Sequence, residues 1–171
     1  GLLRIYDVPL FTGFMYAAVG SFIARAIRLF EMSFAPYPPF WITLCLATAI
    51  YVNFFAHHFM PDMRVALFLA TALIFGRTRI WFTIGENRYW MPFLLAGALT
   101  SFFLWIAENI GTRTETWLYS GQIAGDMVSF AKMGSWFLLI HVSFVTVTLV
   151  FRNVLIPRET AAARPAPSAA E

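Results

Sequence analysis

The sequence predicts an all-α fold, a polytopic bundle of about five transmembrane helices. Of the 171 residues, 60% are hydrophobic and only 12% are charged, whereas soluble domains average about 25% charged residues. Five apolar stretches follow one another, each about 20 residues long, which is the length that crosses the hydrocarbon core of a bilayer. Eleven of the twelve basic residues are Arg and stand mostly between these stretches, as is typical of membrane-protein loops.

The first two stretches cover residues 8–27 and 40–59. Pro9 suits the first turn of a helix, where the missing amide hydrogen is not needed. Arg25 and Arg28 mark the far end of the first stretch, because long basic side chains reach the headgroups. The prolines of PYPPFW break any earlier helix, so we expect the second helix to begin after them.

The third stretch, residues 65–84, is interrupted by Gly76-Arg77-Thr78-Arg79. The fourth and fifth stretches cover residues 90–109 and 133–152. All five are expected to form one transmembrane domain over residues 1–156. Residues 157–171 are rich in Ala and Pro, and we expect a disordered cytoplasmic tail there.

The chain begins on Gly1 and enters an apolar run almost at once, so we expect that an N-terminal segment is missing. The orientation follows from the basic residues on alternate sides of the predicted helices. One side holds eight of them and the other four, namely Arg4, Arg64, Arg113 and Lys132. The richer side is placed in the cytoplasm, together with the C-terminus.

Several classes of function are not favoured by the sequence. The basic residues do not cluster as a nucleic-acid patch does. The single cysteine, Cys45, excludes an internal disulfide and any CxxC motif. The chain has no Walker loop, GxGxxG, GxSxG or HExxH motif. We therefore expect no cofactor, no metal and no nucleic-acid partner, and membrane lipids as the surroundings.

The polar residues collect at the predicted outer face, where several helix ends meet. The candidate cluster consists of Asp7, His57, His58, Glu108, Asn109 and Lys132. Glu108 is the most informative member, because the helix macrodipole disfavours a negative charge at a C-terminal helix end. It needs either a proton or a cation, for which Lys132, Arg113 and one of the two histidines are candidates; the alternative is a hydrated, interfacial carboxylate.

The adjacent histidines of NFFAHHFMPD lie at the end of the second predicted helix. Neighbours in a helix point about 100° apart, so only one of them readily faces a site that Glu108 also faces. A shared metal needs three or four ligands nearby, and few are available. We therefore interpret one of the two, His57 or His58, as the possible partner of Glu108 and the other as a boundary residue at the headgroups; His57 lies deeper by one residue and is the first to mutate.

Two further candidates are intramembrane polar residues, Arg77 and His141. Arg77 and Arg79 lie inside the third stretch, with Glu31, Glu86 or an anionic lipid or substrate as possible partners; the alternative is a cytoplasmic anchor. His141 is either a neutral histidine bonded to a neighbouring helix or a relay position for protons.

Five sequence blocks carry a resemblance to a known family: YDVPLFTGFMYAAVGSFIARA, NFFAHHFMPD, FGRTRIWFTIG with MPFLL, WIAENIGT with WLYSGQ, and KMGSWFLLIHVSFV. Together they resemble the bacterial integral-membrane family catalogued as domain of unknown function 817, over about residues 6–151. The resemblance implies a helical protein of the bacterial inner membrane, with further helices before Gly1. It implies no activity and no catalytic residues.

Three functions remain open. The first is a permease for a small solute or ion, with the ionisable residues bracketing a path. The second is a membrane enzyme that acts on a lipid or isoprenoid with Glu108 as general acid or base; the pattern of Glu108, Gly111, Trp117 and Tyr119 is similar to one in membrane carotenoid hydratases and cyclases. The third is a structural or assembly subunit. The substrate and the oligomeric state are not indicated by the sequence.

Overall fold

The computed structural model describes residues 4–5, 8–9, 11–56, 61–115 and 126–151. This part of the chain is mostly helical, as predicted, and contains five helices: α1 (Phe11–Leu29), α2 (Phe40–Ala56), α3 (Arg64–Phe75), α4 (Phe93–Arg113) and α5 (Phe130–Val150). It also contains five short strands: β1 (Arg4–Ile5), β2 (Val8–Pro9), β3 (Ser33–Ala35), β4 (Arg79–Ile84) and β5 (Asn87–Pro92). The tail, residues 157–171, lies outside the described residues.

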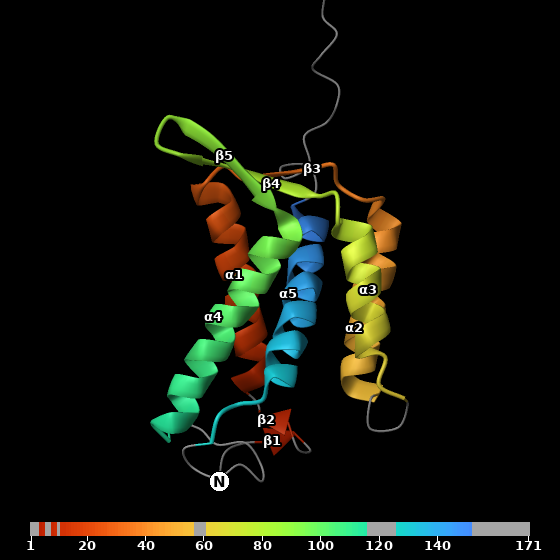
Figure 1. Cartoon of the computed structure of the whole chain (residues 1–171), viewed down its shortest axis with the longest axis vertical. Helices are drawn as coiled ribbons and strands as arrows, with labels where there is room; N and C mark the ends of the chain where they lie inside the picture. The colour runs from red at the N-terminus through yellow and green to blue at the C-terminus, as the bar shows by residue number, and fades with distance from the viewer. Residues whose placement is uncertain (1–3, 6–7, 10, 57–60, 116–125, 152–171) are drawn as a thin grey trace, which may run out of the picture.

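The helices run side by side along the long axis of the molecule, and α5 stands among the others (Figure 1). It contacts all four of the other helices. A sheet of order β3-β4-β5 covers one end of the bundle, and the β1–β2 pair lies at the opposite end. The core between the helices is apolar, with Phe34, Phe75, Phe93 and Phe144 in contact with one another.

The third predicted helix is the main correction. Instead of one helix over residues 65–84, the chain forms the shorter α3, a turn and then strand β4. The turn is closed by Thr78, whose backbone N–H donates to the carbonyl of Phe75. Arg77 therefore lies in the turn and Arg79 in a strand, and neither lies in a helix.

Strands β4 and β5 form an antiparallel hairpin in which Trp81 faces Trp90 and Ile84 faces Asn87. The two-residue connection begins with Gly85 at φ 62°, a left-handed conformation that glycine adopts at little cost. β3 pairs with β4 on its other side, with Ser33 opposite Trp81. Because side chains alternate along a strand, Arg79, Trp81, Arg88 and Trp90 project from one face of the hairpin.

Two of the described helices, α4 and α5, are long and apolar enough to cross a membrane, at 21 residues each. α2 and α3 are apolar but shorter, with 17 and 12 residues. The helix lengths by themselves therefore do not establish a bundle of five transmembrane helices. The two long helices point to a membrane association.

Candidate functional site

Glu108 lies on the inward face of α4, as expected of a carboxyl group with a cationic partner and not of a hydrated, interfacial one. The buried face of this helix runs from Phe93 through Gly97, Ser101 and Trp105 to Glu108. The Glu108 residue is only 7% exposed. An electrostatic attraction links its carboxylate to the partly buried ammonium group of Lys132 on α5. This attraction involves two of the six residues of the predicted outer cluster, and a site formed by the whole cluster stays a prediction.

Asn109, the next residue, holds the segment that leads into α5. Its side-chain oxygen accepts a hydrogen bond from the backbone N–H of Val128 at 2.8 Å. The indole N–H of the buried Trp105 donates to the carbonyl of Val128, also at 2.8 Å. Trp105 and Asn109 thus satisfy both backbone groups of Val128, which is buried. Asn109 has a structural role that the sequence pattern did not reveal.

The remaining members of the predicted cluster, Asp7, His57 and His58, lie outside the described residues. The pairing of one histidine with Glu108, and the presence of Asp7 in the same cluster, stay predictions. At the same end of the bundle, Asp62 and Arg64 form an ion pair at 2.6 Å in the turn before α3. Both side chains are exposed, so this pair contributes little to stability, on the order of 0–1 kcal/mol.

His141 lies midway along α5 and is only 1% exposed. Its Nδ1 lies 2.7 Å from the carbonyl oxygen of Phe137. Because a carbonyl oxygen only accepts, Nδ1 carries the hydrogen of the neutral ring, and Nε2 presents a lone pair. Nε2 is buried and has no hydrogen-bond partner among the described residues. The imidazole packs against the rings of Phe75, Phe93 and Phe137.

Gly97 provides the room for this imidazole. A Cβ at position 97 would lie 2.9 Å from Cε1 of His141 and 3.3 Å from a ring carbon of Phe137. The interior of the α4–α5 interface is therefore filled by an imidazole and aromatic rings. Other buried polar side chains are satisfied locally: Thr71, Ser101 and Thr148 each donate to a carbonyl of their own helix.

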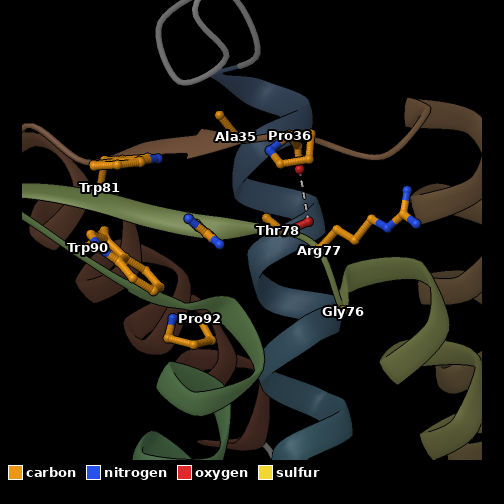
Figure 2. Close-up of a pocket in the computed structure, with 9 residues that line it drawn as sticks. Ala35, Pro36, Gly76, Arg77, Thr78, Trp81, Trp90 and Pro92 are labelled. Carbon is orange, nitrogen blue, oxygen red and sulfur yellow. Dashed lines mark hydrogen bonds between the residues drawn. The ribbon is translucent and has the colours of Figure 1, made fainter.

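A pocket of about 690 Å³ opens at the sheet-covered end of the bundle (Figure 2). Its lining residues come from β3, the turn after α3 and the β4–β5 hairpin, and are Ala35, Pro36, Gly76, Arg77, Thr78, Arg79, Trp81, Trp90 and Pro92. The guanidinium of Arg79 lies over the Trp90 ring, 4.3 Å from its centroid. Arg77 extends away from the two tryptophans in this view. We refer to this hollow as the sheet pocket.

The floor of the sheet pocket is fixed by hydrogen bonds of Thr78. Its hydroxyl donates to the carbonyl of Pro36 at 3.0 Å, and its own carbonyl accepts from the N–H of Phe93 at 3.0 Å. Neither Arg77 nor Arg79 forms an ion pair with a carboxylate of the described residues, so the expected partners Glu31 and Glu86 do not neutralise them. No cluster of metal-ligating side chains occurs in the described ranges.

The fold and these sites define a mostly helical protein with long apolar helices, a buried histidine between them and a basic, aromatic pocket at one end. The chain belongs to the family described as Protein of unknown function (DUF817), whose model matches residues 1–144. It is 41% identical over 148 residues to the Uncharacterized protein YoaT of Bacillus subtilis (strain 168). The match covers 86% of this chain and 56% of that protein, so the chain spans about half the length of this curated relative. No solved structure matches the chain.

Proposed function

We propose that the protein is a multi-pass membrane protein whose five helices cross the bilayer, with the β3-β4-β5 sheet on the cytoplasmic side. The exposed apolar surface carries this proposal. Only 28% of the most apolar part of α4 and 39% of that of α5 is buried, whereas the core helix of a soluble protein is mostly buried. Leu73 on α3 is 83% exposed and Phe103 on α4 is 64% exposed. Lipid is the solvent that suits such a surface.

The basic residues support the proposed orientation. Arg28, Arg77, Arg79 and Arg88 lie at the sheet-covered end, and membrane proteins keep most Arg and Lys in the cytoplasm. The short α3 is about 18 Å long at 1.5 Å per residue, less than the hydrocarbon core of about 30 Å. Local thinning of the bilayer and polar flanking residues accommodate such a helix.

Cys45 offers a direct test of the membrane placement, because it is the single cysteine and is exposed on α2. In membrane vesicles a charged, water-soluble maleimide should fail to label it, and should label it after SDS is added. In a Cys45→Ala background, Glu86→Cys at the hairpin tip and Arg113→Cys at the end of α4 should react from opposite sides. Ready labelling of Cys45 in intact vesicles, or of both new cysteines from one side, contradicts the proposal.

The activity we propose first is that of a permease for a small solute. It is supported by ionisable residues at successive depths: Glu108 with Lys132 at one end, His141 midway along α5, and Arg77 with Arg79 at the other end. Ionisable groups at membrane depth mark solute or proton pathways in many transporters. In this proposal, the aromatic rings that pack on His141 would close the path.

Uptake into proteoliposomes tests the permease proposal, with inorganic phosphate as the first probe. Glu108→Gln and His141→Ala should lower the initial uptake rate at least tenfold, whereas Thr146→Ala, an exposed position on α5, serves as the matched control. Uptake that is equal in all these variants contradicts the role of the buried ionisable residues.

A membrane enzyme is the second candidate, and the burial of Glu108 beside Lys132 favours it. A carboxyl group held away from water serves as a general acid or base. Its test is the conversion of an isoprenoid or lipid substrate by the reconstituted protein, lost in Glu108→Gln and kept in Glu115→Gln. An assembly subunit is less favoured, because Gly20 on α1, a small residue that would let another helix approach closely, already packs on Val147 of α5.

A further inference from the structure

The sheet pocket combines positive charge, aromatic rings and a fixed floor. The register of the hairpin places Trp81 opposite Trp90, and the period of two brings Arg79 and Arg88 to the same face. Arg79 lies over Trp90 and Arg88 over Trp81, at 4.3 and 5.5 Å from the ring centroids. The result is an alternating array of guanidinium groups and indoles.

The stacking leaves Arg79 able to bind an anion. A guanidinium that lies over a ring contacts the ring with its flat face. Its N–H groups then point outward in the plane of the guanidinium. Those N–H groups match two oxygens of a phosphate or carboxylate at once. Arg88 differs, because its Nη2 already donates to the hydroxyl of Ser33 at 3.0 Å. Arg79 is therefore the anchoring residue of the array.

Within the described part of the chain, no carboxylate forms an ion pair with an arginine of the sheet pocket. No carboxylate is among the residues that line it, and Arg77 adds a second guanidinium from the turn. The volume of about 690 Å³ is in the range of small-ligand sites, roughly 300–1,000 Å³. Arginine is also the residue type that recognises phosphate oxygens most specifically, and two arginines line the pocket.

We propose that the sheet pocket binds a phosphate-bearing anion, with Arg79 as the bidentate anchor and the two indoles packed beside the phosphate. Arg77, whose side chain extends away from the tryptophans (Figure 2), adds positive charge at longer range. Two sources supply this chemistry: the headgroup of an anionic phospholipid and a soluble phosphate. Only the lipid source rests on the proposed membrane placement, because a soluble phosphate reaches the pocket in detergent as well.

The experiment measures binding to the purified chain in dodecyl maltoside by native mass spectrometry and titration calorimetry. The probes are inorganic phosphate, dioctanoyl phosphatidylglycerol and dioctanoyl phosphatidylcholine. The variants are Arg77→Gln and Arg79→Gln, with Arg113→Gln as the control, since Arg113 is an exposed arginine at the opposite end of α4. Arg77→Gln is needed in addition because Arg79→Gln also removes a ring contact.

We expect phosphatidylglycerol or inorganic phosphate to bind, Arg79→Gln to weaken binding about tenfold or more, and Arg77→Gln to weaken it by a smaller factor, with no change in Arg113→Gln. Binding of the lipid alone identifies a headgroup site, and binding of inorganic phosphate identifies a soluble ligand. The inference is overturned if neither binds, if phosphatidylcholine binds as tightly as phosphatidylglycerol, or if all three variants weaken binding equally. Such a failure leaves the cysteine-labelling test of the membrane placement untouched.

Discussion

Gly97→Ala tests how closely α4 and α5 are packed around His141. The new Cβ would lie 2.9 Å from Cε1 of the imidazole. The imidazole cannot easily move aside, because its Nδ1 is hydrogen-bonded to the Phe137 carbonyl and it packs against the rings of Phe93 and Phe137. Overpacking of this kind costs about 1–3 kcal/mol, and replacing a helical glycine by alanine returns about 1 kcal/mol. The variant should therefore be destabilised by roughly 0–2 kcal/mol.

A double-mutant cycle separates the two contributions. With His141→Ala already present, Gly97→Ala no longer meets the imidazole and should stabilise the fold by up to about 1 kcal/mol. The coupling energy should then be about 1–3 kcal/mol. The measurement is reversible unfolding by SDS in dodecyl maltoside micelles, followed by circular dichroism. Gly20→Ala is the matched control, since its Cβ would lie 3.9 Å from Val147, an ordinary contact. A coupling below about 0.5 kcal/mol would refute the packing argument.

Three further changes test other features by the same unfolding measurement. Trp105→Phe keeps an aromatic ring but removes the donor to the buried Val128 carbonyl; we expect a loss of about 1–3 kcal/mol, and an unchanged free energy would mean that water replaces the bond. Tyr37→Phe removes the 2.9 Å hydrogen bond to Thr148 on α5, with an expected loss of about 0.5–1.5 kcal/mol; no loss would contradict a contribution of this bond. Gly85→Ala should cost about 1–2 kcal/mol because φ is 62° there, although no atom lies near the new Cβ; a neutral result would contradict the turn conformation.

The apolar pattern of the sequence predicts the helices well because hydropathy and length are properties of single segments. It failed over residues 65–84 because a short apolar strand and a buried helical turn have the same hydropathy. The local signals of the hairpin are nevertheless present: an unbroken run of β-branched and aromatic residues follows Arg79, and Gly85 provides the turn. The β-branched and aromatic composition of this run, bounded by Gly76 and Gly85, separates β4 from α3 where a hydropathy window does not.

The candidate sites were predicted less completely. The depth of Glu108 and Lys132 in their helices predicts a shared level, and the structure brings the two together. The role of Asn109 depends on Val128, which belongs to another segment, so no spacing in the sequence indicates it. The sheet pocket likewise depends on the pairing of β3 with β4, a contact between two loops that are separated by two helices.

That pairing has a consequence for how the chain is made. β3 follows α1 directly, but the strand it needs is synthesised only after α2 and α3. During biosynthesis the connection between α1 and α2 therefore leaves the ribosome with a strand whose amide and carbonyl groups have no strand to bind. We expect the hairpin of β4 and β5, which joins neighbouring residues, to form before β3 pairs with β4. Pairing of β3 with β4 is thus expected late in folding. It joins the α1–α2 connection to the segment after α3, so it requires that α3 has reached its final position.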